Sequence, residues 1–237
     1  MLAHRPPSCI ADLGCGTGNI VPFMRQAWPA AAIECVDLSS EMLAQAKTDL
    51  AAEPNVTFTQ ADLGAYTPTA PLDVIFSNAA LHWLTDHGAL FPKLISFLVP
   101  GGLLAVQMPD TRLQPSHLLM RQAAINLGLG ERVRDVRVVT VEGDGTWYHS
   151  VLKKHCAVVD IWSTTYIQSL HGADAVAKFT RETGLKPFIA ALGGEQTEQA
   201  QAFETEYRRL CRSAYPASED GAVLFPFTRM FIVAKKL

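Results

Sequence analysis

The segment with the clearest chemical pattern is the glycine-rich stretch at 12–19, DLGCGTGN. Its three glycines alternate with other residues and follow directly on the apolar run Ser8–Leu13. A glycine-rich turn between a strand and a helix lets a ligand approach the backbone and presents N–H groups to it. The spacing therefore predicts a turn that binds a small polar ligand, with an acidic residue, Asp12, just before it.

The glycine spacing separates this turn from two nucleotide-binding motifs. A dinucleotide fingerprint requires G-x-G-x-x-G, in which Gly14 and Gly16 fit but Asn19 stands where the third glycine belongs. Gly18 comes one residue early, and Asp12 inside the end of a strand is unusual for that fingerprint. A P-loop would require Gly-Lys-Ser/Thr, which the stretch lacks. A dehydrogenase is therefore the least favoured alternative, and absence of NAD binding would exclude it.

Strands and helices alternate over the first half of the chain and position the glycine turn. The expected strands are 8–13, 31–38, 55–63, 71–81 and 103–109, and the expected helices are 19–27, 39–50 and 88–98. Strands separated by helices pair in parallel through right-handed crossovers. This predicts a doubly wound, mostly parallel α/β sheet of Rossmann-like type, whose ligands bind beyond the carboxyl ends of the strands.

The second half of the chain adds two strands and helical segments. Alternating residues predict a long sixth strand at 157–170 and a last strand at 223–237. Helical cap insertions are expected at about 112–156 and 171–216. Since no repeat or linker separates these segments, we expect a single domain over 1–237.

Composition excludes several classes of protein. Of the 237 residues, 49% are hydrophobic and 18% charged, which is typical of a soluble globular chain rather than a disordered one. The net charge of −3 gives no indication of nucleic-acid binding, and no apolar run approaches the roughly 20 residues of a membrane helix. Five dispersed cysteines without a CxxC pair indicate free thiols and no metal site. We expect a cytoplasmic monomer without a leader peptide.

The pattern DLGCGTG, followed by an acid at the end of the second strand, resembles the class I S-adenosylmethionine-dependent methyltransferases. The resemblance extends through PGGLLAVQ and the closing strand, and it implies that the last strand is antiparallel. It implies S-adenosylmethionine as the cofactor, which has a zwitterionic tail, a ribose and an adenine but no phosphate. By this resemblance Asp37 accepts hydrogen bonds from the ribose, and Asp62 and the Leu63 N–H bind adenine. Asp12 and a carbonyl near Asn78 would serve the ammonium of the tail. The other implied cofactor residues are Gly14, Cys15, Gly16, Gly18, Asn19, Leu38, Met42 and Ala79.

Four further blocks resemble the trans-aconitate methyltransferase family. They are SNAALHWLTDH, GGLLAVQMPD, GADAVAKFTRETGLKPFIAAL and LFPFTRMFIVAKK. The resemblance implies formation of a methyl ester on a carboxylate of a small tricarboxylic acid. A carboxylate is already an anionic nucleophile at neutral pH, so the enzyme mainly has to align the reactants, exclude water and neutralise a polyanion.

Four residues are candidates for that work. His82 could donate to a substrate carboxylate, and Trp83 could form a wall of the pocket. Gln107 could donate from the fifth strand, and Arg229 in the last strand could pair with a carboxylate. Each candidate also has a purely structural alternative. His82 and Trp83 could simply pack beneath the cap, and Gln107 could be an ordinary residue at a strand end. Arg229 could be a solvated surface residue.

Two segments depart from the family pattern. Helical sequence normally precedes the first strand, where this sequence has about seven residues, so we expect an unusually open site if nothing lies upstream. The segment 126–146 also matches poorly, in a region where cap residues are expected. Two alternatives therefore stay open: a methyltransferase for another small or carrier-bound carboxylic acid, and a lid-less, non-catalytic cofactor-binding protein.

Overall fold

The structure, a computed structural model, describes residues 6–172 and 174–237. Its contacts divide the chain into two compact units. The first comprises the described residues up to Met108 with Glu142–Ser163 and Met230–Leu237, and the second comprises Pro109–Val141 and Thr164–Arg229. The expected single domain with two insertions stays a prediction. Residues 1–5, on which the expected absence of a leader partly rests, lie outside the described part.

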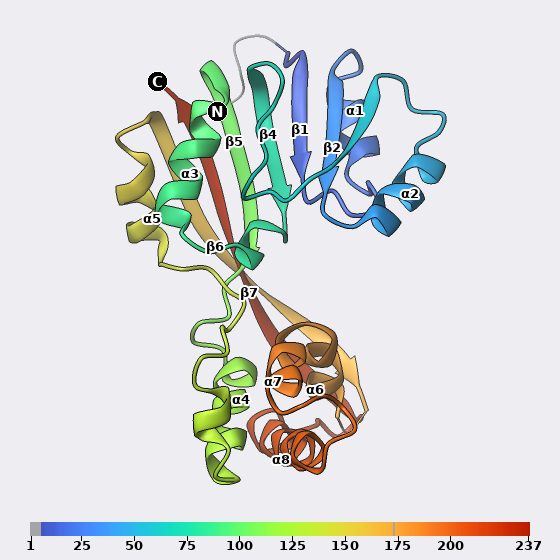
Figure 1. The fold of residues 1–237 in the computed structure, drawn as a ribbon, viewed down its shortest axis with the longest axis vertical. Helices are drawn as coiled ribbons and strands as arrows, with labels where there is room; N and C mark the ends of the chain where they lie inside the picture. Colours follow the sequence, from blue (N-terminus) through green and yellow to red (C-terminus); the bar gives the residue numbers. More distant parts are fainter. Residues whose placement is uncertain (1–5, 173) are drawn as a thin grey trace. The chain divides into compact units, whose positions relative to one another are not determined.

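A seven-stranded sheet in the order β3-β2-β1-β4-β5-β7-β6 organises the chain (Figure 1). The strands are β1 (Cys9–Leu13), β2 (Ala32–Asp37), β3 (Val56–Gln60), β4 (Leu72–Asn78), β5 (Leu98–Pro109), β6 (Cys156–His171) and β7 (Ala222–Lys236). The strands β3, β2, β1, β4 and β5 pair in parallel, and the carboxyl-terminal strands are antiparallel. This confirms the predicted mostly parallel α/β fold with an antiparallel last strand.

The described part of the first unit has five helical elements, and three of them begin at side-chain caps. They are α1 (Val21–Ala27), α2 (Ser40–Asp49), the 3₁₀ turn η1 (Leu81–Trp83), α3 (His87–Ser96) and α5 (Gly145–Leu152). Ser39 caps α2 by accepting from the Met42 N–H, and Asp86 caps α3 by accepting from the Ala89 N–H. The core under α1 joins residues of that helix to three strands: Val21, Met24, Ile10, Ile33 and Val74. Burial of these side chains seats α1 on the sheet.

Several expected element boundaries are wrong. The strand β3 ends at Gln60 rather than at 63, and β4 ends at Asn78 rather than at 81, because the chain turns there toward η1. The strand β5 begins at Leu98 rather than at 103, so Pro100, Gly101 and Gly102 lie inside a strand rather than in the expected gap between a helix and a strand. A register shift between Leu72 and Val74 of β4 accommodates this irregular start. The helix α1 begins at Val21 rather than at 19, because the glycine turn continues to residue 20.

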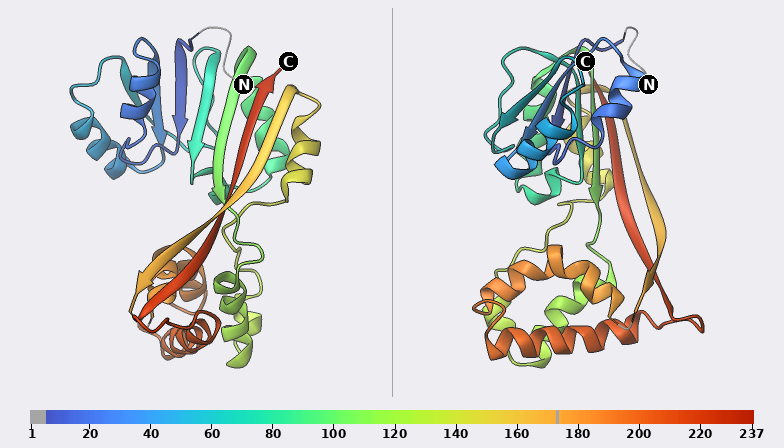
Figure 2. Two further views of the ribbon diagram at one scale, coloured as in Figure 1. Left: turned by 180° about the vertical axis from the view of Figure 1, so that it is seen from behind. Right: turned by 90° about the vertical axis from the view of Figure 1, so that its right-hand side faces the viewer.

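The second unit is helical apart from its parts of β6 and β7. Its elements are α4 (Pro115–Asn126), the 3₁₀ turn η2 (Gly130–Val133), α6 (Ala175–Thr180), the π-helical turn η3 (Arg181–Leu185), α7 (Lys186–Ala191) and α8 (Glu198–Ala214). The helices α4 and α8 lie side by side (Figure 2), and the Tyr207 hydroxyl of α8 donates to the Ser116 carbonyl of α4 at 2.9 Å. Stacked Phe188 and Phe203 form the centre of this unit's core. No helix in the described ranges is long and apolar enough to cross a membrane.

The substitution Phe91→Ala tests the aromatic core beneath α3. Phe91 is fully buried, with the rings of His87 and Tyr148 centred 5.4 and 5.0 Å away. Removing the ring leaves a cavity, so urea denaturation should show a loss of about 3–5 kcal/mol in the free energy of unfolding. Phe23→Ala is the matched control in the same unit, since that side chain is 68% exposed and should cost no more than about 0.5 kcal/mol. Equal losses in the two variants would contradict the described core.

Candidate functional site

The glycine turn after β1 is held against the ends of two neighbouring strands. The N–H groups of Gly14 and Cys15 both donate to the Val36 carbonyl of β2, at 2.7 and 3.1 Å. Gly14 has φ of +76°, and a Cβ placed on it would lie 2.1 Å from the Cβ of Ala80. Only glycine fits there, because a side chain would collide with the turn that follows β4.

Gly16 has a different environment, since a Cβ on it would meet no atom within 4 Å. Its N–H donates to Asp37 Oδ2 at 2.8 Å, and Asp37 Oδ1 accepts from the Ser39 N–H at 2.9 Å. Each carboxylate oxygen can accept more than one hydrogen bond. Asp37 is therefore fixed by the backbone and retains capacity to accept from a ligand beside the open face of Gly16.

Asp12, the last acid before the turn, is buried at 2% exposure. Its Oδ2 has no hydrogen-bond partner among the described residues. Burial, and to a smaller extent the negative charge of Asp37, raise the pKa of Asp12 to about 7. A buried carboxylate with an unsatisfied oxygen favours the approach of a cation or a hydrogen-bond donor.

Cys15 is a structural member of the turn. A hydrogen bond to Cys35 and burial raise the pKa of the Cys15 thiol, so the thiol stays protonated and is a poor nucleophile. The side chain packs against the core cluster that contains Cys35. Gly18 lies close to Leu50, and Asn19 accepts from the Thr17 hydroxyl at 3.2 Å.

The turn after β3 contributes Asp62 and Leu63. Asp62 is exposed, and its Oδ1 accepts from the Gly64 N–H at 2.8 Å, which fixes a tight local turn. The ideal Cβ position of Gly14 lies 3.7 Å from Leu63 Cδ1, so this turn borders the glycine turn. On the side of β2, Leu38 and Met42 are 66% and 44% exposed, which leaves apolar surface next to Asp37.

The turn after β4 carries two of the four catalytic candidates. His82 is 6% exposed and Trp83 is 49% exposed, with their ring centroids 5.4 Å apart. Asn78 pairs in register with Gln107 of β5, which is 6% exposed. The Ala79 N–H donates to the Gln107 carbonyl at 2.9 Å, and Ala79 has φ of +52°. A left-handed alanine is strained, so this contact holds the chain where β4 turns into η1.

Arg229, the remaining candidate, belongs to the second unit. Its guanidinium lies over the rings of Tyr166 and Phe227, at 5.9 and 5.6 Å from their centroids. Stacking on two aromatic rings orients a guanidinium. The predicted pairing of Arg229 with a substrate carboxylate stays a prediction.

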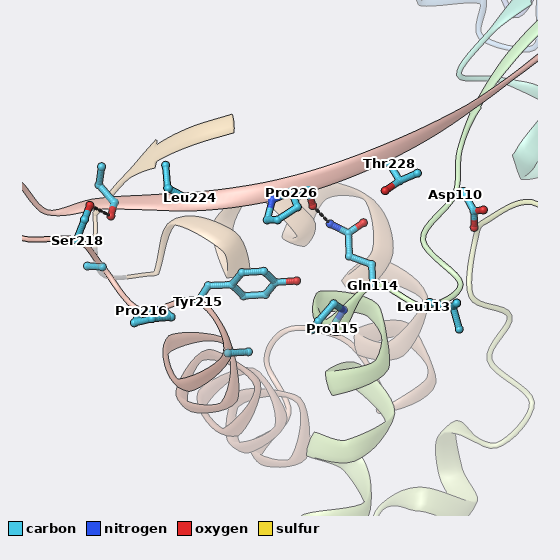
Figure 3. A pocket seen from close by; sticks show the side chains of 13 residues that line it. Asp110, Leu113, Gln114, Pro115, Tyr215, Pro216, Ser218, Leu224, Pro226 and Thr228 are labelled. Carbon is cyan, nitrogen blue, oxygen red and sulfur yellow. Dashed lines mark hydrogen bonds between the residues drawn. The ribbon is translucent and has the colours of Figure 1, made fainter. Parts of the chain in front are cut away.

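The second unit also contains an open pocket of about 780 Å³ between the start of α4, the end of α8 and β7 (Figure 3). Gln114 joins two of its walls by donating from Nε2 to the Pro226 carbonyl. The hydroxyl of Tyr215 accepts from the Ser116 N–H at 2.9 Å. None of the candidate residues named from the sequence lines this pocket.

Sequence reasoning missed residues that hold the site from behind. The Ser77 hydroxyl of β4 is buried and donates to the Leu13 carbonyl of β1 at 2.7 Å, which ties the two strand ends together. His87 and Tyr148 are fully buried beside η1, 2.5 Å apart through Nδ1 and the hydroxyl. Ser77 and His87 are the two ends of the block SNAALHWLTDH, but no motif indicates the role of any of the three residues, since it depends on contacts between distant segments.

Comparison with known proteins identifies the family. The profile of a methyltransferase domain matches residues 10–102. The chain is 42% identical over 236 residues to a trans-aconitate 2-methyltransferase of Klebsiella pneumoniae (strain 342), covering all of this chain and 89% of that protein. It is 40% identical over 225 residues to a protein of the same name from Azoarcus sp. (strain BH72), covering 95% and 86% of the two chains.

Solved structures show the same fold. The YcgJ protein from Bacillus subtilis superimposes with a TM-score of 0.60 at 15% identity, covering 98% of this chain and 93% of that one. A phosphoethanolamine N-methyltransferase 2 from Haemonchus contortus, in complex with S-adenosyl-L-methionine, gives a TM-score of 0.54 at 17% identity and covers 98% and 50%. By its full-length similarity, the chain belongs to the class I S-adenosylmethionine-dependent methyltransferases, within the trans-aconitate 2-methyltransferase family.

Proposed function

We propose that the protein methylates a carboxylate of a small tricarboxylic acid, trans-aconitate, to form a methyl ester. The observation that carries the proposal is the 42% identity to a trans-aconitate 2-methyltransferase over the whole of this chain. The clustering of acids, glycines and the His82 turn at the strand ends of the first unit supports it. Fold alone would not identify a substrate.

The residues of the first unit fit S-adenosylmethionine. The orphaned oxygen of Asp12 suits a group that carries an ammonium, and the open face of Gly16 leaves room for a ligand against the backbone. Asp37 would accept from the ribose hydroxyls, with Leu38 and Met42 offering apolar surface nearby. Asp62 and the Leu63 N–H would bind adenine. When bound, the cofactor supplies a methyl group activated by a positively charged sulfur.

The acceptor needs little chemical activation. A carboxylate is ionised at neutral pH, so no residue has to remove a proton from it. The work left to the protein is to align the acceptor oxygen with the methyl group, to exclude water and to neutralise the other carboxylates. In the first unit His82 and Gln107 would donate to the acceptor, and Trp83 would shield it.

A radiolabelled-methyl transfer assay tests this function. The purified protein would be given S-adenosylmethionine with trans-aconitate, cis-aconitate, citrate, isocitrate or a carrier-bound acid. We expect label in trans-aconitate, in a product that alkali hydrolyses as an ester. Faster transfer to another acid would reassign the substrate, and cofactor binding without transfer to any acid would overturn the proposed function.

Asp37→Asn tests the proposed ribose contact. The change removes the charge and places an NH₂ group against one of the two backbone N–H groups that now donate to Asp37. Losing charge-assisted hydrogen bonds of about 1–3 kcal/mol should raise the Kd for S-adenosylhomocysteine about 5- to 150-fold in calorimetry. Asp49→Asn at the exposed end of α2 is the matched control and should leave the Kd unchanged. An unchanged affinity in Asp37→Asn would refute the role.

Asp12 predicts a pH dependence of cofactor binding. Its pKa is about 7 in the free protein, and a bound ammonium favours the ionised carboxylate. Affinity for S-adenosylhomocysteine should therefore rise by up to about eightfold between pH 6 and pH 7.5, as the fraction of ionised Asp12 increases. The ligand amine stays mostly protonated over this range. Asp12→Asn should abolish the slope, and a slope retained in that variant would assign the proton to another group.

A further inference from the structure

A buried hydrogen-bond chain connects α5 and α3 to the turn that carries His82 and Trp83. His87 Nε2 lies 3.0 Å from the Leu81 carbonyl of η1, and His87 Nδ1 lies 2.5 Å from the Tyr148 hydroxyl. The Tyr148 oxygen in turn accepts from the Glu142 N–H at 3.2 Å. All of these residues belong to the first unit.

One set of proton positions satisfies all three contacts. The Leu81 carbonyl can only accept, so Nε2 of His87 carries a proton and donates to it. With His87 neutral, Nδ1 accepts from the Tyr148 hydroxyl, whose oxygen remains available for the Glu142 N–H. The chain of donors therefore runs from Glu142 through Tyr148 and His87 to Leu81.

The Leu81 carbonyl, which accepts from His87, is also hydrogen-bonded within η1. The Leu81 oxygen also accepts from the Leu84 N–H at 2.9 Å, and the Trp83 N–H donates to the Ala80 carbonyl at 3.0 Å. Both lone-pair directions of the Leu81 oxygen are thus occupied, one from inside the turn and one from His87. A change at His87 would release the turn on the side that faces α3.

The surroundings keep the imidazole in one orientation. The carboxylate of Glu142 accepts from the N–H groups of Asp86 and His87, both at 2.7 Å, and so secures the start of α3. The rings of Phe91 and Trp147 enclose His87 and Tyr148, with centroids 5.4 Å from His87 and 4.8 Å from Tyr148 respectively. An apolar aromatic pair would fill the same space, so packing alone does not require two polar side chains here.

We propose that His87 and Tyr148 are positioning residues, which hold η1 so that His82 and Trp83 meet the acceptor in a fixed geometry. The part of this inference that concerns the acceptor rests on the proposed function. Neither residue would touch the acceptor or the cofactor. Misplacement of reacting groups by a fraction of an ångström slows a transfer reaction strongly, which gives the hydrogen-bond chain a catalytic consequence.

Tyr148→Phe in the full chain tests the proposal, because it removes one hydroxyl and keeps the ring. Hydrogen–deuterium exchange should become about five- to tenfold faster in the peptide that contains the Trp83 and Leu84 amides. The kcat for methyl transfer to trans-aconitate should fall by a similar factor, with the Kd for S-adenosylhomocysteine unchanged. Tyr66→Phe is the matched control, since Tyr66 is also buried in the first unit and donates its hydroxyl to Glu34 at 2.7 Å. It should leave both exchange in η1 and kcat unchanged.

His87 offers a second pair of variants. His87→Gln retains an N–H group that can reach the Leu81 carbonyl, whereas His87→Phe keeps a ring without any donor. We expect His87→Gln to recover most of the kcat that His87→Phe loses. Equal activity of the two variants would show that only packing matters at this position.

The outcomes separate this proposal from the proposed function. Unchanged exchange in η1 for Tyr148→Phe would overturn the positioning role, and so would faster exchange with a kcat equal to that of Tyr66→Phe. If the unaltered protein methylated none of the acids, the proposed function would fail. The exchange data would then still decide whether the pair holds the turn.

Discussion

The close approach of Gly14 to Ala80 is the constraint on which the site of the first unit depends. With 2.1 Å between the ideal Cβ of one and the Cβ of the other, the turns after β1 and β4 leave no room for a side chain between them. Two N–H groups of the same turn are bound to the end of β2. The ends of three strands therefore converge, and the acids that follow them are brought to one edge of the sheet.

The two turns divide the work between them. In the proposed function the glycine turn, with Asp12 and Asp37, would bind the cofactor, while the side chains of η1 would meet the acceptor. The first is fixed mainly by backbone contacts within the sheet. The second is fixed from behind by α3 and α5, through the carbonyl of Leu81. Different mutations should therefore affect cofactor binding and transfer.

Much of this arrangement was predictable from local patterns. Apolar periodicity predicted the strands of the parallel half, and the rule for strand ends selected Asp37 and Asp62. The start of β5 was mispredicted because Pro100, Gly101 and Gly102 indicate a break, whereas a register shift against β4 absorbs them within the strand. Local patterns also could not reveal the pairing of His87 with Tyr148, which depends on how α3 and α5 pack, or the burial of Asp12.

The buried carboxylate of Asp12 affects the stability of the protein against unfolding, and so its turnover in a cell. Since the pKa of Asp12 is about 7, the ionised carboxylate lowers the stability of the ligand-free fold above neutral pH, by on the order of several kcal/mol. This loss of stability disappears as the pH falls toward 4 and Asp12 becomes protonated. A ligand that satisfies Asp12 offsets this loss and adds its own binding free energy. Proteolytic turnover acts on the unfolded fraction, so the abundance of the protein would follow the supply of its cofactor.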